Sequence, residues 1–368
     1  MGAAETLTGW EMRAAGEPLA PAVRPLRALK PGEAMVRIAG CGLCHTDIGY
    51  LFEGVPTRRP PPLILGHEIS GIVEDAGSGA RSRIGEAVVV PAVLPCGWCA
   101  LCRAGRGVIC RSQVMPGNDC DGGFADRVIL PARGLCRVPG GGSAFDAPLG
   151  NASGLTLRHL AVVADAVSTA WMAVKRAAIQ PGDLVVIVGL GGVGTYAAQF
   201  AAAAGGVVAG VDVDPLRLAG AAALGCSLGL DPRSLPPKEL RARLRDHGKR
   251  QGCPDSEWKL FECSGTPAGQ TTAWGLLNHG ATLMVVGYTA DALTLRLSNL
   301  MAFDARALGN WGCPPEEYPA LLDLVLDGRV HVAEHVELRP LAGLPAAIGE
   351  VHDRKVRRRL VFCPESRD

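Results

Sequence analysis

The pattern of apolar and polar positions divides the chain into two styles. From about residue 181 onward, continuous apolar runs predict buried strands at Leu184–Val188 and Val207–Val211. Between these runs, residues 193–204 have the length and the Ala-rich composition of a helix. Further strands are predicted at Lys259–Glu262 and at 282–286. Because strands that alternate with helices form parallel sheets covered on both faces, this part is predicted to be an α/β domain.

The same region contains a second predicted helix at 216–224, followed by strand residues 227–230. The first part of the chain instead shows short β segments, such as 34–39 and 87–91, separated by Gly and Pro. Near the end, residues 316–326 are typical of a helix that stops before a glycine. A chain of 368 residues is long for one core, which favours two domains.

Composition and charge narrow the class of protein. Hydrophobic residues make up 48% and charged residues 20%, which indicates a soluble globular enzyme rather than a disordered chain. The formal net charge of +1 gives no electrostatic reason to expect nucleic acid as a partner. A basic cluster at residues 354–359 is predicted to be a solvated face rather than a phosphate site.

One uncharged stretch, residues 184–211, is long enough to span a bilayer. Glycines interrupt it repeatedly, so we interpret it as strand, turn, helix and strand and expect no membrane association. The N-terminus has no basic start followed by an apolar run, so no secretion signal is expected. The 13 cysteines are therefore predicted to be reduced thiols of a cytoplasmic protein, some of them holding metal.

A cluster of cysteines forms the strongest local motif. Four thiols lie within one short loop, at Cys96, Cys99, Cys102 and Cys110. Zinc accepts four thiolates in tetrahedral geometry, and four protein ligands leave no open position, so the motif predicts a structural zinc site. Free thiols, a disulfide pair or a nucleic-acid-binding zinc ribbon are the alternatives, and the ribbon lacks a basic or aromatic surface.

A glycine motif follows the first apolar strand. Its residues are Gly189, Gly191, Gly192, Val193 and Gly194, in the pattern Gly-x-Gly-x-x-Gly. Such a turn between strand and helix lets the backbone approach a pyrophosphate, although a plain packing turn has the same pattern. Asp212 ends the next strand at the offset expected for a ribose-binding carboxylate, which predicts NAD and disfavours the extra phosphate of NADP.

Two further segments, Cys44-His45-Thr46-Asp47 and Gly66-His67-Glu68, are metal-like but weak on their own. In this order with the four cysteines and the glycine motif, the chain resembles the zinc-containing alcohol dehydrogenases of the medium-chain superfamily over essentially its whole length. The resemblance implies that Cys44 and His67 bind a catalytic zinc. It implies a third ligand just before Ser168-Thr169, where this chain has Asp165 and many members have Cys.

The resemblance also implies roles around the metal and the cofactor. Glu68 resembles the glutamate behind the metal, Asp47 the carboxylate that orients the histidine ligand, and Thr46 the hydroxyl that relays the substrate proton. The place of a relay histidine is taken by Gly49, which leaves the outer proton path open. Other positions resemble contacts to the dinucleotide, at the pyrophosphate for His45 and Arg357 and near the ribose for Arg217.

The implied organisation is a GroES-like, mostly β catalytic domain at residues 1–166 with both zinc sites. It continues with a Rossmann domain at 167–310, a doubly wound parallel sheet that binds NAD, and a C-terminal return to the catalytic domain at 311–368. The implied activity is oxidation of an alcohol by zinc and NAD in a homo-oligomer, a dimer or tetramer. Zinc-free reductases share the fold but lack these ligands, and a non-catalytic zinc- and nucleotide-binding protein is the alternative of another class.

Longer segments suggest the substrate. Residues 40–50, 114–119, 261–266, 297–303 and 307–315 resemble the dehydrogenases of 6-hydroxycyclohex-1-ene-1-carbonyl-CoA in anaerobic benzoyl-CoA degradation. This resemblance implies a cyclic secondary alcohol carried on CoA, whose phosphates would need a basic entrance. Arg58 and Arg59 are predicted contacts, with an ordinary exposed loop as the alternative. Another secondary or cyclic alcohol remains the second possibility.

Overall fold

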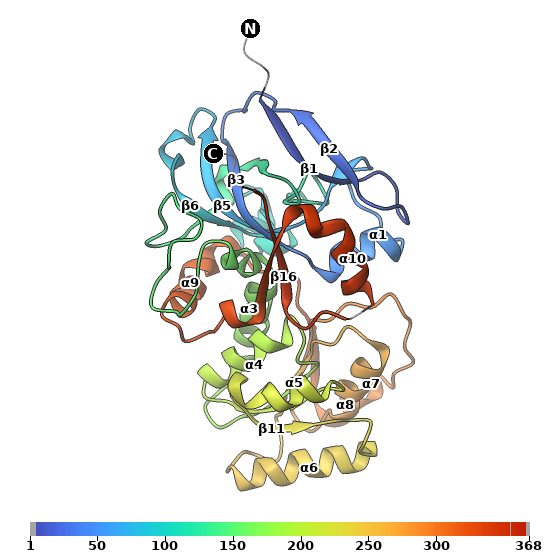
Figure 1. The fold of residues 1–368 in the computed structure, drawn as a ribbon. Helices are drawn as coiled ribbons and strands as arrows, with labels where there is room; N and C mark the ends of the chain where they lie inside the picture. The colour runs from blue at the N-terminus through green and yellow to red at the C-terminus, as the bar shows by residue number, and fades with distance from the viewer. Residues whose placement is uncertain (1–4, 354, 366–368) are drawn as a thin grey trace. The chain divides into compact units, whose positions relative to one another are not determined.

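The computed structural model describes residues 5–353 and 355–365. The chain divides into two compact units. The first unit comprises Met1–Ser168 with Gly312–Asp368, and the second comprises Thr169–Trp311. The chain thus leaves the first unit once and returns to it, as the colours of Figure 1 show.

The second unit is built on a six-stranded parallel sheet of order β11-β10-β9-β12-β13-β14. Its strands are β9 (Leu184–Val188), β10 (Val207–Val211), β11 (Cys226–Leu230), β12 (Lys259–Glu262), β13 (Thr282–Val285) and β14 (Arg306–Gly309). The central strand β9 is buried throughout, as its continuous apolar run requires for a strand covered on both faces. The predicted parallel α/β domain is confirmed.

Helix α3 (Ala166–Ala177) leads into the first strand of this sheet. The helices between the strands are α4 (Gly194–Ala203), α5 (Pro215–Gly220), α6 (Pro237–Arg250), α7 (Pro267–Gly275) and α8 (Ser298–Phe303). The helix predicted at 216–224 is wrong in one respect, because α5 gives way to a 3₁₀ turn at Ala221–Leu224 before a left-handed Gly225. Helix α6 was not predicted, since its surface is highly charged and only Leu240, Leu244, His247 and Gly248 are buried.

The first unit contains a mixed seven-stranded sheet of order β15-β16-β3-β5-β6-β8, with β7 paired to β3, and a three-stranded sheet of order β2-β1-β4. The strands are β1 (Thr6–Met12), β2 (Ala20–Pro25), β3 (Glu33–Gly42), β4 (Leu63–Ile64), β5 (Glu68–Ala76), β6 (Ala87–Val90), β7 (Arg127–Pro131), β8 (Cys136–Arg137), β15 (Val336–Pro340) and β16 (Arg359–Cys363). The helices are α1 (His45–Phe52), α2 (Ala100–Arg103), α9 (Tyr318–Leu326) and α10 (Leu344–His352).

The C-terminal segment completes the first unit through β16. This strand pairs antiparallel with β3, with Phe362 opposite Cys41 and Val361 opposite Gly42. Both strands contribute side chains to one apolar core, Leu360 and Phe362 from β16 and Ile38 and Cys41 from β3. The last strand therefore lies beside the residues that lead into the Cys44 segment.

Among the described residues, no helix has the length and apolarity required to cross a bilayer. Residues 184–211, the uncharged stretch long enough to span a bilayer, are divided among β9, α4 and β10, as expected from their glycines.

Candidate functional site

Three side chains far apart in the sequence converge in the first unit. The ligand atoms of Cys44, His67 and Asp165 all lie within 4.8 Å of one another. His67 Nε2 is 3.3 Å from Asp165 Oδ2, and Cys44 Sγ is 3.6 Å from the same oxygen. A thiol, an imidazole and a carboxylate at these separations can face one common ion, which matches the ligand set implied by the sequence.

Local structure places each of the three. Cys44 is the N-cap of α1, directly after β3 ends. His67 precedes β5 and follows Gly66, whose φ of 93° is left-handed. A Cβ at Gly66 would also lie 2.7 Å from the sulfur of Cys41, so only glycine fits before the histidine. Asp165 lies between a 3₁₀ turn at His159–Ala164 and α3.

The chemistry of this group fits a bound cation. His67 is 1% exposed, yet neither of its ring nitrogens makes a hydrogen bond within the described structure. Burial alone would lower the pKa of His67, but the carboxylates of Asp47 and Asp165 outweigh it and raise the pKa well above its ordinary value. A zinc ion between the three side chains would give the imidazole a partner and neutralise the surrounding negative charge.

Asp47 lies behind the histidine. Its Oδ1 is 3.6 Å from His67 Nδ1 and accepts a hydrogen bond from the N–H of Gly66 at 3.1 Å. Its Oδ2 accepts from the N–H of Cys44 at 3.0 Å. One fully buried carboxylate thus joins the two segments that carry Cys44 and His67.

The four cysteines of the loop also converge. The ligand atoms of Cys96, Cys99, Cys102 and Cys110 lie within 4.8 Å of one another. Burial raises the pKa of Cys96, but backbone N–H groups of Trp98 and Cys99 stabilise its thiolate and bring the pKa to about 6. Burial raises the pKa of Cys102 to about 12, so the convergence of the four sulfur atoms, rather than a uniformly lowered pKa, is what favours a common zinc ion.

The glycine motif forms a tight turn between β9 and α4 in the second unit. Gly189 has a φ of 92°, and a Cβ there would lie 2.7 Å from the backbone of Ser264. A Cβ at Gly194 would lie 1.8 Å from the carbonyl oxygen of Gly189, so a side chain is excluded at the helix start. Gly191 has no protein atom closer than 3.6 Å to its missing Cβ, which leaves its backbone approachable.

Asp212 ends β10 beside this turn. Its carboxylate accepts hydrogen bonds from the N–H of Leu190 at 2.6 Å and of Asp214 at 2.8 Å. The guanidinium of Arg217 lies 3.6 Å from the same carboxylate. It also lies 3.6 Å from the position that a Cβ on Gly191 would occupy. The structure therefore brings together the glycine turn, the acidic residue and the basic residue that the sequence singled out.

Comparison with known proteins identifies the family. Residues 30–140 match the alcohol dehydrogenase GroES-like domain, and residues 192–327 match the zinc-binding dehydrogenase domain. An alcohol dehydrogenase of Geobacillus stearothermophilus is 32% identical over 317 residues, covering 85% of this chain and 87% of that relative. The chain belongs to the zinc-binding alcohol dehydrogenases. Its expected fold and enzyme class are confirmed, and a small-molecule alcohol is its substrate.

Other relatives cover nearly the whole dehydrogenase. An alcohol dehydrogenase of Rhizobium meliloti (strain 1021) is 27% identical over 359 residues, 97% of this chain and 98% of that protein. The solved structure of the alcohol dehydrogenase from Aeropyrum pernix superposes with a TM-score of 0.83 at 27% identity, covering 97% of this chain and 100% of that one. The similarity therefore includes both units.

Glu68 of the dehydrogenase has a partner that the sequence analysis missed. Arg359, the first residue of β16, donates from Nε to Glu68 Oε2 at 3.0 Å and from Nη2 to Oε1 at 2.5 Å. Glu68 is fully buried, and a Cβ at Gly42 would lie 2.0 Å from its Oε2. The sequence carried no clear signal for this pair, since the three residues after Arg359 are all buried and the strand does not alternate.

Thr46 and His45 occupy the first turn of α1. The hydroxyl oxygen of Thr46 lies 3.6 Å from Cys44 Sγ, so the proposed relay residue adjoins the metal ligands. His45 is exposed. At Gly49 a Cβ would meet Val55 at 3.4 Å and the carboxylate of Glu53 at 3.7 Å.

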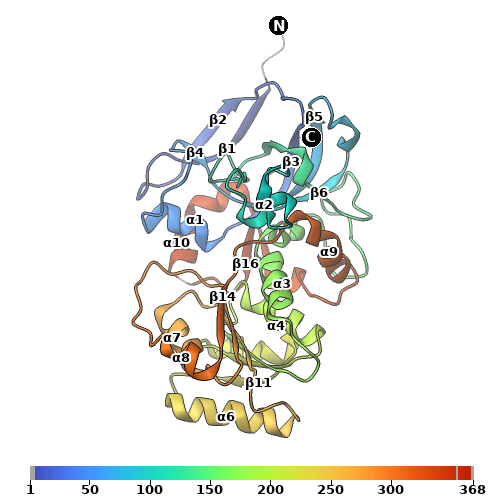
Figure 2. The ribbon, with the colours of Figure 1, turned by 180° about the vertical axis from the view of Figure 1, so that it is seen from behind.

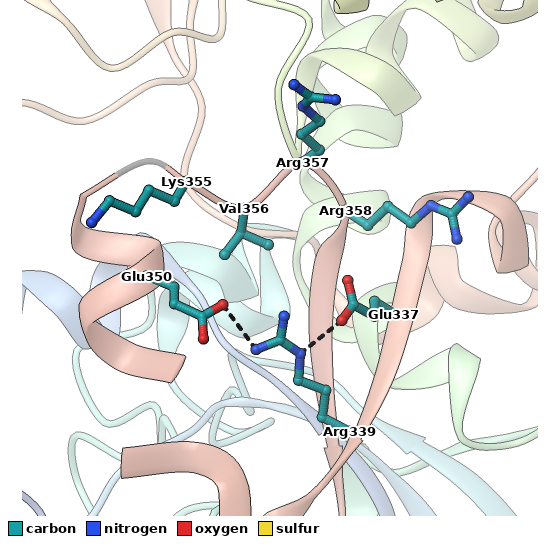
Figure 3. Close-up of a pocket in the computed structure, with 7 residues that line it drawn as sticks. All are labelled: Glu337, Arg339, Glu350, Lys355, Val356, Arg357 and Arg358. Carbon is teal, nitrogen blue, oxygen red and sulfur yellow. Dashed lines mark hydrogen bonds and ion pairs between the residues drawn. The ribbon is translucent and has the colours of Figure 1, made fainter. Parts of the chain in front are cut away.

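Arg357 lies elsewhere in the first unit, in an open pocket of about 430 Å³ formed by β15, α10 and residues 355–358. Figure 3 shows the guanidinium of Arg339 held between Glu337 at 2.7 Å and Glu350 at 3.0 Å, with Arg357 and Arg358 pointing away from it. Contact between Arg357 and a pyrophosphate stays a prediction. Arg354, which begins the basic cluster, lies outside the described residues.

Proposed function

We propose that this dehydrogenase oxidises a secondary alcohol to a ketone with NAD, using a catalytic zinc held by Cys44, His67 and Asp165. The observation that carries the proposal is the convergence of three different donor types around a buried histidine whose two ring nitrogens face carboxylates without forming a regular hydrogen bond. A second zinc held by the four cysteines would have no open position and would stabilise the loop. Elemental analysis of active protein tests this, since at most one zinc per chain would contradict it.

When bound, the catalytic zinc supplies a Lewis acid that lowers the pKa of the alcohol. Thr46, whose hydroxyl oxygen is 3.6 Å from Cys44 Sγ, would accept the alcohol proton and pass it outward. Asp47 would hold the two ligand segments together, because its carboxylate accepts hydrogen bonds from the N–H of Cys44 and from the N–H of Gly66, the residue before His67. Asp165→Ala should abolish turnover with much of the fold retained.

NAD is the proposed cofactor because Asp212 carries a negative charge where the adenosine ribose would bind. Two backbone N–H groups fix this carboxylate, so it cannot turn away from a ribose phosphate. Arg217 partly offsets the charge through its ion pair at 3.6 Å. We expect NAD to be preferred over NADP by about an order of magnitude or more in kcat/KM.

The finer proposal is that the substrate is 6-hydroxycyclohex-1-ene-1-carbonyl-CoA, oxidised to the conjugated ketone. Two of the segments that suggested it lie close to Gly66, the residue before His67. A Cβ at Gly117, in segment 114–119, would lie 2.8 Å from the nitrogen of Gly66, and a Cβ at Gly66 would lie 2.7 Å from the sulfur of Cys41, in segment 40–50. Tyr50, in segment 40–50, is buried, and its pKa rises to about 12 because of that burial. These segments are therefore able to shape the surroundings of the reacting alcohol.

The predicted CoA contacts have other partners in the structure. Arg58 lies 3.2 Å from Asp119, and Arg59 lies 3.1 Å from Asp121. Because both charges are compensated, the ion pairs favour the exposed-loop interpretation, and a role in phosphate binding stays a prediction. Arg58→Ala should raise KM for the thioester with little change in kcat if the contact exists.

The substrate proposal is tested by steady-state rates with NAD. The value of kcat/KM for the CoA thioester is compared with those for cyclohexenols and primary alcohols. Preference for the thioester supports the proposal. Equal or better rates with the free alcohols would reject it and leave a dehydrogenase for another secondary or cyclic alcohol.

We also propose a homo-oligomer, built through the β14 edge of the sheet in the second unit. Strand β14 is the last strand of its sheet, and α8 precedes it in the chain (Figure 2). Leu297 is 72% exposed and Met301 78% exposed, so apolar side chains accompany an unpaired strand edge. Light scattering that gives a monomer mass at micromolar concentration would contradict this. The cytoplasmic location also stays a prediction.

A further inference from the structure

Asp165 lies at an irregular point of the backbone, between two helical segments. Its φ of −138° and ψ of −69° belong neither to the preceding 3₁₀ turn nor to α3. Cys44 and His67 adjoin the paired strands β3 and β5, in which Gly42 lies opposite Glu68. Asp165 lies outside these paired strands, so groups other than strand hydrogen bonds hold its backbone in place.

Two hydroxyl groups provide that support. Tyr318 Oη donates to the carbonyl oxygen of Ala164 at 2.6 Å. Ser168 Oγ lies 3.2 Å from the carbonyl oxygens of both Ala164 and Asp165, and 3.1 Å from Tyr318 Oη. The carbonyls on both sides of the Asp165 Cα are thereby tied to one small network.

The network is buried and comes from a distant part of the chain. Tyr318 is fully buried and Ser168 is 1% exposed. Tyr318 begins α9, in the C-terminal segment that returns to the first unit. Burial raises the pKa of Tyr318 well above its ordinary value, so the hydroxyl stays a donor across the working pH range. The carbonyl oxygen of Ala164 also accepts from Ser168 Oγ at 3.2 Å and from the N–H of Ala92 at 3.2 Å, so loss of the Tyr318 hydroxyl would remove the shortest of three hydrogen bonds and let this carbonyl shift.

We propose that Tyr318 and Ser168 are positioning residues for the carboxylate ligand Asp165. The inference rests on the proposed function, in which Asp165 binds the catalytic zinc. A carboxylate can turn about its side chain and can bind through either oxygen, so its placement depends on the backbone that carries it. Neither hydroxyl needs to touch the metal, the alcohol or the cofactor.

The test is the rate of zinc release from holoenzyme to a chromogenic chelator. Tyr318→Phe removes one oxygen and keeps the ring. We expect it to release one zinc about 10- to 100-fold faster, the range typical for partners of metal ligands. The second zinc, on the four-cysteine loop, should leave at the wild-type rate and serves as an internal control. Ser168→Ala should act in the same direction.

A matched control is Tyr196→Phe, which removes a hydroxyl from a tyrosine that is 1% exposed in the second unit. It should leave both release rates unchanged. The visible spectrum of cobalt-substituted protein gives a second measurement, because it reports the geometry of the ligands. Tyr318→Phe should change the cobalt bands at the catalytic site and leave those of the thiolate loop unchanged.

Two results would overturn the inference. One is wild-type retention of both zinc ions with an unchanged cobalt spectrum in Tyr318→Phe. The other is equal acceleration at both sites, which would mean a general loss of stability. Failure of the proposed function is distinguishable, because Asp165→Ala would then itself retain two zinc ions with wild-type affinity.

Discussion

The ion pair between Arg359 and Glu68 offers the sharpest test of how the metal site is held. Glu68 is fully buried and the side chain of Arg359 is 9% exposed, so neither charge is well hydrated. Replacing Arg359 by Leu leaves the carboxylate with the N–H of Ala166 at 3.0 Å as its remaining neutral donor. Breaking a buried pair on one side costs about 3–5 kcal/mol, a large part of the roughly 5–15 kcal/mol of a typical protein.

The pH dependence of this loss has a definite sign. Burial already raises the pKa of Glu68 above 4.5 although Arg359 lowers it, and removing Arg359 should raise the pKa further. When folding raises the pKa of a carboxyl group, the protonated group is compatible with the folded state. The protein then loses stability as pH rises through that pKa and the group becomes charged. Arg359→Leu should therefore be close to wild type near pH 5 and much less stable near pH 8.

Urea denaturation of zinc-loaded protein, followed by circular dichroism, measures the effect. The double variant Glu68→Leu with Arg359→Leu is the control, because it removes both charges and should recover most of the lost stability. A single variant within about 1 kcal/mol of wild type at pH 8 would refute the reasoning, since it would show that Glu68 needs no counter-ion.

Three further outcomes are expected. Cys99→Ser should lower the unfolding temperature and leave one zinc per chain by elemental analysis, because it removes a ligand of the loop site; two retained zinc ions would contradict the assignment. Asp212→Gly should narrow the ratio of kcat/KM for NAD over NADP, and equal use of both cofactors by wild type would point to Arg217 instead. Thr46→Ala should slow turnover by about 100-fold or more with little change in NAD binding, and Thr46→Ser should restore it. An unaffected alanine variant would show that the proton leaves by another route.

Local features of this dehydrogenase were predictable because each lies within one loop or one strand–helix unit. The four cysteines span one short segment, and their spacing alone favours a common ion. Gly189 and Gly194 are separated by one turn, so the closeness of their backbones follows from the strand and helix on either side. The apolar pattern located β9 and β10 for the same reason, since burial on both faces leaves a continuous apolar run.

The catalytic site needed a family resemblance before its ligands could be named, because Cys44 and Asp165 are 121 positions apart. Only the tertiary structure decided which groups surround them. The pairing of β16 with β3 brings Arg359 to Glu68, and the returning α9 brings Tyr318 to Ala164. The tertiary structure also pairs Arg58 with Asp119 and Arg59 with Asp121, whereas the sequence alone suggested free positive charges. Patterns along the chain report burial and local turns, whereas partners across a sheet depend on register and strand order, which no single segment encodes.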